Sequence, residues 1–197
     1  MRSFKTILLM AVATLLLAGV APAQKKTKSA DADYIAQALS AAPKAVAKDA
    51  AVARMETDGK MTTLRDGKNG FTCMVLKGEK MCADANSMEF FGAVMKHEPP
   101  TDKLGLVYML SGHDAGASNT DPFATGKTAD NHWVVTGPHV MILGSASKSF
   151  GLSKTPEADP SKPYMMWADT PYEHAMIPVT SEAGAAKSAM PKTEAKK

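Results

Sequence analysis

The sequence has few of the residues that usually carry redox chemistry, and no apolar stretch long enough to span a bilayer. It holds two cysteines and 6% aromatic residues in 197 positions. Beyond the N-terminal segment, no apolar run reaches the ~20 residues that a membrane-spanning helix needs, so a multi-pass membrane protein is not expected. The 45% hydrophobic and 22% charged residues are ordinary for a globular chain. This composition argues against a wholly disordered chain.

Several well-known catalytic signatures are also missing. The chain has no G-x-S-x-G, no H-E-x-x-H, no Walker A motif and no G-x-G-x-x-G. It also lacks C-x-x-C-H, the attachment signal for covalent haem. No enzyme class is therefore indicated by a local motif, and any site has to be assembled in space.

Residues 1–23 have the pattern of a secretory signal peptide. Arg2 and Lys5 precede an uncharged, apolar stretch of about sixteen residues, which is too short to span a bilayer. Ala21 and Ala23 then supply the small-x-small pattern that signal peptidase cleaves. We expect cleavage near Ala23 and a periplasmic or extracellular location.

Charge and composition divide the rest of the chain. Residues 24–30 are polar and rich in Lys, whereas residues 181–197 are rich in Ala, Lys and Glu. We expect both segments to be disordered. Residues 31–180 are expected to form one globular domain. Residues 29–180 hold fourteen basic and eighteen acidic residues, with no basic stripe of the kind that binds nucleic acid. Nucleic acid is therefore not an expected partner.

The two cysteines are predicted to form a disulfide. An exported chain folds in an oxidising compartment. Residues 71–76 and 79–82 are predicted to be two strands joined by a tight turn at Lys77 and Gly78. Counting outward from that turn places Cys73 directly opposite Cys82, in a non-hydrogen-bonded pair where side chains approach closely. The alternative, a redox pair or thiolate metal site, has no C-x-x-C to support it.

The periodicity predicts an α+β fold, with an antiparallel sheet packed against one or two short helices. Helical spacing is seen at residues 31–41 and again after a capping-box-like pair, Asn86 and Glu89. Three short strands with Gly-bearing turns, the third being the cysteine hairpin, predict an antiparallel meander. The first two meander strands are residues 51–56 and 61–65, and further strands are expected at residues 104–110, 132–143, 164–167 and 175–179.

Methionine is the unusual residue, with fourteen copies in the chain. Two His-x-Met pairs, His139 with Met141 and His174 with Met176, lie in strand-like segments. Residues i and i+2 of a strand share one face, so each pair would present an imidazole and a thioether together. Thioethers select Cu(I), and imidazole suits copper generally. These four residues are therefore a candidate soft-metal site, with copper as the possible cofactor. The alternative is that they are core residues.

A second candidate site lies in the polar segment 111–131, which is expected to be a long loop. It contains His113, Asp114, Ser118 and Asp121, the residue types of a nucleophile, a base and an orienting acid. They would support a small hydrolase-like enzyme. The alternative is a loop whose short polar side chains bond its own backbone.

The chain also resembles a group of small exported bacterial proteins without an assigned biochemical role. The similarity covers residues 34–179 and rests on short runs at positions 70–73, 81–82, 118–124, 137–141, 163–167 and 170–174. It implies an exported single domain and transfers no activity. The favoured function is a non-enzymatic binding domain, with copper binding as its sharpest form. The hydrolase and a structural or interaction protein of the cell envelope are the alternatives.

Overall fold

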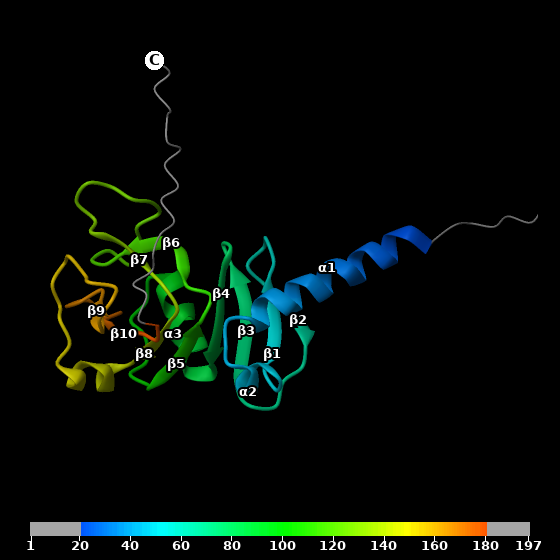
Figure 1. The fold of residues 1–197 in the computed structure, drawn as a ribbon, viewed down its shortest axis with the longest axis horizontal. Helices are drawn as coiled ribbons and strands as arrows, with labels where there is room; N and C mark the ends of the chain where they lie inside the picture. The colour runs from blue at the N-terminus through cyan, green and yellow to red at the C-terminus, as the bar shows by residue number, and fades with distance from the viewer. Residues whose placement is uncertain (1–20, 181–197) are drawn as a thin grey trace, which may run out of the picture.

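A computed structural model of the chain describes residues 21–180, and only the backbone of residues 21–28. The expected C-terminal tail, and the expected signal peptide up to residue 20, lie outside these residues. The described chain has the element order shown in Figure 1. The helices are α1 (Ala21–Leu39), α2 (Lys44–Ala47), α3 (Ala85–Lys96) and the 3-10 helix η1 (Ser145–Phe150). The strands are β1 (Ala51–Met55), β2 (Met61–Arg65), β3 (Phe71–Leu76), β4 (Glu79–Asp84), β5 (Gly105–Met109), β6 (His113–Ser118), β7 (Trp133–Thr136), β8 (His139–Leu143), β9 (Tyr164–Met166) and β10 (His174–Pro178).

The α+β prediction is confirmed. Eight strands form one sheet in the order β2-β1-β3-β4-β5-β8-β10-β9, and β6 pairs with β7 separately. The helix expected from residue 31 begins earlier, at Ala21, so residues 24–30 are helical rather than a disordered lead-in. Within the described residues, no helix combines the length and hydropathy that crossing a bilayer requires.

The predicted meander differs in one pairing. β1 lies between β2 and β3, and its pairing with β3 is parallel. The connection from β2 to β3 therefore crosses the start of β1, where the Lys68 N–H donates to Asp49 O at 2.8 Å. Only glycine fits at position 67, because a Cβ there would overlap the backbone nitrogen of Ala51. The tight crossing depends on this contact, which strand periodicity does not reveal.

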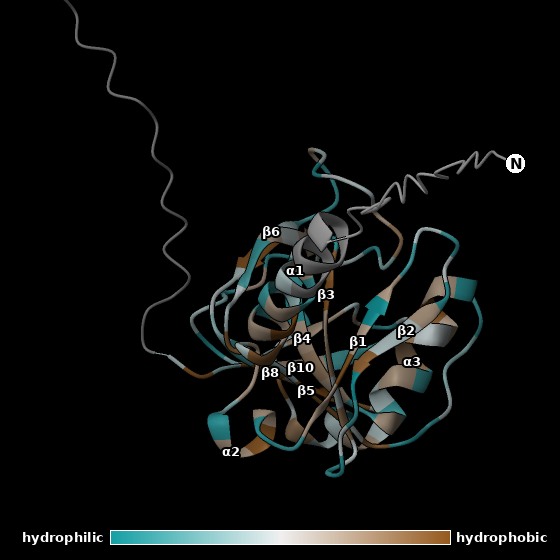
Figure 2. Cartoon of the chain, turned by 90° about the vertical axis from the view of Figure 1, so that its right-hand side faces the viewer, coloured by the Kyte–Doolittle hydropathy of each residue, from teal (hydrophilic) through white to brown (hydrophobic). Residues whose placement is uncertain are grey.

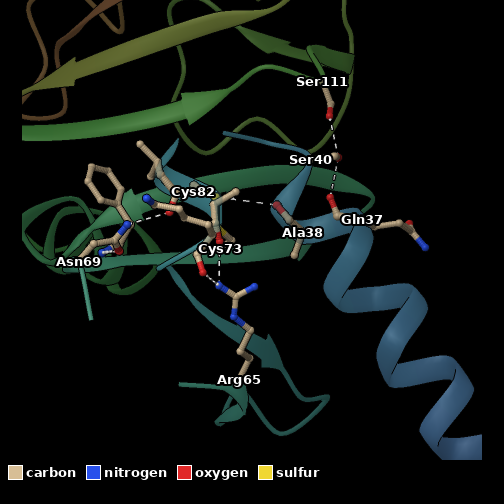
Figure 3. The surroundings of a disulfide bond; sticks show 12 residues. Gln37, Ala38, Ser40, Arg65, Asn69, Cys73, Cys82 and Ser111 are labelled. Atoms are coloured by element: carbon tan, nitrogen blue, oxygen red, sulfur yellow. Dashed lines mark hydrogen bonds between the residues drawn. A yellow bond between two sulfur atoms is a disulfide. The ribbon is translucent and has the colours of Figure 1, made fainter. Parts of the chain in front are cut away.

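The predicted disulfide is confirmed in the β3–β4 hairpin. Leu76 faces Glu79 across the two-residue turn, and Cys73 is the Cα partner of Cys82. The two cysteines are bonded and fully buried, and Ala38 of α1 lies against them (Figure 3). A bond of this kind indicates an oxidising compartment.

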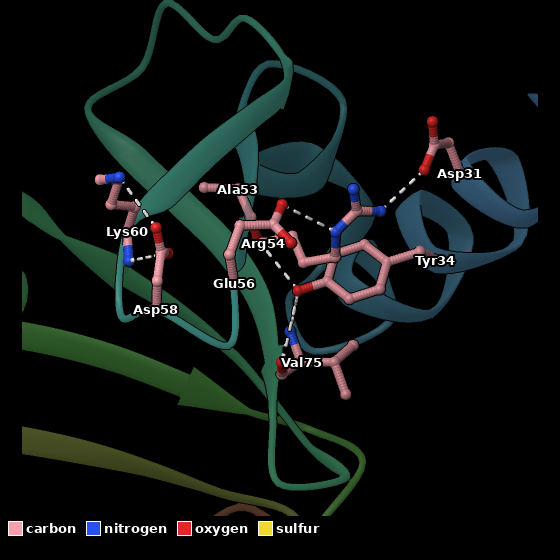
Figure 4. A network of polar contacts seen from close by, with 8 residues as sticks. All are labelled: Asp31, Tyr34, Ala53, Arg54, Glu56, Asp58, Lys60 and Val75. Carbon is pink, nitrogen blue, oxygen red and sulfur yellow. Dashed lines mark hydrogen bonds and ion pairs between the residues drawn. The ribbon is translucent and has the colours of Figure 1, made fainter. Parts of the chain in front are cut away.

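The two helices α1 and α3 cover opposite faces of the sheet (Figure 2). α1 packs the buried Ala38 and the partly buried Ile35 and Leu39 against the disulfide face. The Tyr34 hydroxyl joins it to two strands, since it donates to Ala53 O at 3.1 Å and accepts from the Val75 N–H at 3.0 Å (Figure 4). α3 begins after Asp84, whose carboxylate accepts from the Ser87 N–H at 2.8 Å. Asp84 is thus the cap, in place of the expected Asn86.

The opposite face carries the methionine-rich core. Its buried members come from β3, β4, β5, β8, β9 and β10, with Phe90 of α3 packed on them. The face is rich in thioethers: Met74, Met81, Met109, Met141, Met166 and Met176 are all less than a tenth exposed. β6, β7 and the segment after β6 lie over the same core, where Val134 joins the cluster. A sheet face with this composition is where the candidate site has to be sought.

Candidate functional site

Both His-x-Met pairs project from one buried face of the sheet, as the alternation predicts. β8 alternates between buried and half-buried positions, with His139 and Met141 both buried. In β10, His174 and Met176 are each about 1% exposed. The two strands are antiparallel neighbours in the sheet. The two imidazoles and the two thioethers therefore lie on the same buried face of the sheet.

The strand register groups these side chains differently from the expected four-residue set. Met141 lies directly opposite Met176, whereas His139 lies opposite Pro178. The register thus places the histidines at opposite ends of the methionine pair, about 13 Å apart along the strands at 3.3 Å per residue. The structure brings the two methionines together and does not bring the two imidazoles side by side.

Each histidine instead has its own two methionines. Met166 of β9 is the cross-strand partner of His174, and Met176 is two positions along in β10. We call these three residues the His174 set. Cross-strand partners on one face have Cβ atoms about 4.5–5.5 Å apart, within reach of flexible thioethers.

The second group is built in the same way. Met109 of β5 is the cross-strand partner of His139, and Met141 is two positions along in β8. We call His139, Met109 and Met141 the His139 set. The sheet therefore carries two similar nitrogen–sulfur groups, joined at the Met141–Met176 pair.

Backbone carbonyls fix the tautomer of both imidazoles. Nδ1 of His174 lies 2.9 Å from Tyr172 O, and Nδ1 of His139 lies 2.6 Å from Gly137 O. A carbonyl only accepts, so Nδ1 donates its proton and Nε2 keeps a lone pair. Burial lowers the pKa of each histidine to about 4, although the carbonyl contacts oppose it. Neutral imidazoles held this way are typical of metal ligands.

A cavity of about 370 Å³ opens onto this face. His113 and His174 lie in its wall, with Lys77 and Glu79 among the few charged lining residues. The remaining lining is mostly apolar or sulfur-bearing and includes Met81, Met109, Met141, Met166, Met176, Phe91, Trp133 and Trp167. Among the side chains that the structure describes, no group of three His, Cys, Asp or Glu residues is placed to hold a metal. The cavity wall brings together imidazole nitrogens and thioether sulfurs.

Two tryptophans of the cavity wall were not anticipated from the sequence. The Trp167 ring lies 4.9 Å from the His174 ring at a steep angle of 76°. Its indole N–H donates to Ser118 O at 2.9 Å, and that of Trp133 donates to Ala115 O at 3.0 Å. Trp167 has a left-handed backbone (φ 55°), which no spacing in the sequence signals. Apolar ring surface therefore borders the His174 set.

The segment 111–131 is not one long loop, since it contains β6, which pairs with β7. Ser118 is occupied by its own turn: its hydroxyl donates to Asn131 O at 2.6 Å and accepts from the N–H of Asp121 at 2.8 Å. The carboxylate of Asp121 accepts from the Phe123 N–H at 2.8 Å. These contacts match the alternative prediction, in which the short polar side chains of this segment bond its own backbone.

His113 is the one member of this candidate group in the cavity wall. Burial lowers its pKa, and the nearby Glu79 and Asp114 carboxylates oppose that shift. Asp114 itself is exposed. Within the described residues, no hydrogen bond joins His113 to Ser118 or Asp121, so the expected nucleophile, base and acid are not assembled.

The polar loop is nevertheless ordered by aromatic packing. Phe123 stacks on His97 with ring centroids 3.9 Å apart, and it meets Tyr172 edge-on at 5.5 Å. Its neighbours Ala124 and Thr125 line the cavity. The loop therefore closes one side of the cavity.

Comparison of the chain with protein-family models, curated proteins and solved structures finds no match to any of them.

Proposed function

We propose that this chain is an exported binding protein for a soft monovalent metal ion, Cu(I), held by the His174 set. The observation that carries the proposal is a buried imidazole, fixed at Nδ1 by Tyr172 O, with two thioethers on its own sheet face. Export is supported by the Cys73–Cys82 disulfide and by the signal-like N-terminus. The role is one of binding, without catalysis.

The donor chemistry favours Cu(I) over harder ions. Thioethers are soft, neutral ligands that select Cu(I), whereas Mg²⁺ and Ca²⁺ need oxygen ligands. Nε2 of His174 supplies the nitrogen, and Met166 and Met176 supply the sulfurs. Met141, opposite Met176, is a further thioether within the same cavity. The Trp167 ring beside His174 adds a surface that attracts cations.

Competition for Cu(I) against a chromophoric chelator under anaerobic conditions tests the proposal. The disulfide-bonded protein is expected to withdraw Cu(I), and Met166→Leu with Met176→Leu is expected to weaken binding at the His174 set by at least about 100-fold. Met-to-Leu changes conserve volume and usually cost less than about 1.5 kcal/mol, so the fold should survive. The matched control is Met165→Leu, since Met165 is equally buried but is adjacent to Met166 in an alternating strand. Equal affinity and equal stoichiometry in all three proteins would refute the proposal.

The size and rings of the cavity favour a second candidate, a small apolar organic ligand. A volume of about 370 Å³ lies within the ~300–1,000 Å³ range of ligand pockets, and Phe91, Trp133 and Trp167 offer flat surfaces. Leucine variants would retain such a ligand, whereas Ala117→Phe would fill part of the cavity and expel it. An apolar fluorescent probe displaced only in the Ala117 variant would favour this candidate over the metal.

A further inference from the structure

His139 carries a polar atom that the fold leaves without a partner. Its side chain is fully buried, and Nε2 makes no hydrogen bond. Nδ1 is held by Gly137 O at 2.6 Å, so the ring cannot turn to satisfy Nε2 without losing that contact. An unpartnered buried acceptor is destabilising, and in native proteins such an atom calls for a specific explanation. A ligand bound at Nε2 would supply that explanation.

The neighbours of His139 are the donors that a soft metal requires. Met109 is its cross-strand partner, and Met141 is two residues along on the same face. Both thioethers reach the cavity wall, and His113 lines the same cavity. On the other side of His139 the partner is Pro178, which offers no side-chain donor. The available set is therefore one nitrogen and two sulfurs.

We infer that Nε2 of His139 and the thioethers of Met109 and Met141 form a second soft-metal site beside the cavity, so that the chain takes two Cu(I) ions. This inference rests on the proposed function for the choice of metal, but it uses none of the three residues of the His174 set. The sites adjoin at Met141 and Met176, which face each other across β8 and β10. An ion held at one set is therefore next to a thioether of the other.

Filling the second site is a simple ligand exchange. The Cu(I) ion leaves its carrier and forms bonds to Nε2 and two neutral sulfurs, with no change in oxidation state. No proton is released, because the imidazole is held as the neutral Nδ1–H tautomer and thioethers carry no proton. Ag(I), which has the same soft character, is therefore a redox-inert probe.

The stoichiometry of Cu(I) and Ag(I) binding tests the inference on the full disulfide-bonded protein. We expect two equivalents for the unaltered chain. Met109→Leu with Met141→Leu should leave one equivalent, and so should Met166→Leu with Met176→Leu. The Met74→Leu variant is the control, because Met74 is a buried methionine of the same core that does not line the cavity. It should still bind two.

The possible failures are distinguishable. One equivalent in the unaltered chain, kept in the Met109/Met141 variant, overturns the second site and leaves the proposed function standing. One equivalent that is lost in the Met109/Met141 variant alone supports the His139 set and overturns the His174 set. No binding overturns both. The ¹⁵N NMR resonance of His139 Nε2 supplies a direct readout, since it should shift on addition of Ag(I) in the control and stay unmoved in the Met109/Met141 variant.

Discussion

Met141 and Met176 are Cα partners across β8 and β10, on the buried side of the sheet. The pair stands between the two histidines, so it contributes one thioether to each nitrogen–sulfur set. One variant in which both methionines are replaced therefore tests both sets.

Replacing Met141 and Met176 together by leucine is expected to weaken both sites while preserving the fold. Each set loses one of its two thioethers, and we expect Cu(I) affinity to fall at least about 10-fold at each. The unfolding free energy should change by less than about 1.5 kcal/mol per substitution. Chelator competition and denaturant unfolding measure the two quantities. A loss of stability large enough to unfold the chain would instead identify the pair as packing residues.

Stability without metal should decrease as the pH falls from about 6.5 towards 4. The pKa values of His139 and His174 are about 4 in the folded protein and near 6.5 when unfolded. Between these values the unfolded chain binds more protons than the folded one. The unfolding free energy therefore decreases as the pH is lowered, by about 3 kcal/mol per histidine at most. Urea unfolding at several pH values measures this slope. An unfolding free energy that stays constant between pH 7 and 5 would show that the imidazoles are hydrated.

Loss of the Cys73–Cys82 bond should destabilise the protein by about 2.5–3 kcal/mol, the chain-entropy value for a loop of this length. The double variant Cys73→Ala with Cys82→Ala avoids burying free thiols at these fully buried positions. Its denaturation midpoint, compared with that of the oxidised protein, gives the cost. A midpoint equal to that of the oxidised protein would mean that the hairpin holds without its crosslink.

Tyr34→Phe should destabilise the attachment of α1 by about 1–2 kcal/mol, because the partly buried Ala53 C=O and Val75 N–H each lose the hydroxyl as a hydrogen-bond partner. Tyr108→Phe is the matched control: Tyr108 packs partly buried in the same cluster, and its hydroxyl makes no hydrogen bond within residues 21–180. Thermal unfolding of the two variants should separate them. Equal unfolding midpoints would show that the Tyr34 hydroxyl contributes no more to stability than the Tyr108 hydroxyl.

The hydrolase alternative can be tested at Ser118. Its hydroxyl is occupied by Asn131 O and two backbone N–H groups, so a serine-directed fluorophosphonate should not label it. Ser118→Ala should lower the unfolding free energy by about 1–2 kcal/mol through the lost turn contacts. Stoichiometric labelling of Ser118, found by mass spectrometry, would restore the enzymatic reading of this segment.

Local patterns predicted the parts of the structure that local geometry determines. The two-residue turn at Lys77 and Gly78 fixes the hairpin register, so the pairing of Cys73 with Cys82 followed by counting. Alternation likewise placed His139 beside Met141 and His174 beside Met176 on one face.

The parts that could not be predicted depend on contacts between distant segments. Residues 144–173, which include η1 and β9, separate β8 from β10. Nothing local indicates that Met141 would meet Met176 or that His174 would meet Met166. β6 was missed because its Asp, Gly, Ala and Ser residues have low strand propensity. It forms by pairing with β7, where Trp133 packs so closely on Gly116 that a Cβ would overlap the indole.

Copper K-edge X-ray absorption of the Cu(I)-loaded protein tests the central claim most directly, because it reports the atoms bound to the metal. The account predicts sulfur together with one imidazole nitrogen around each copper. In a chain whose His139 set is removed by Met109→Leu with Met141→Leu, the sulfur contribution should be lost on adding Met166→Leu with Met176→Leu and persist on adding Met165→Leu. A first shell made only of nitrogen and oxygen, or a spectrum that these added Met166 and Met176 substitutions leave unchanged, would contradict it.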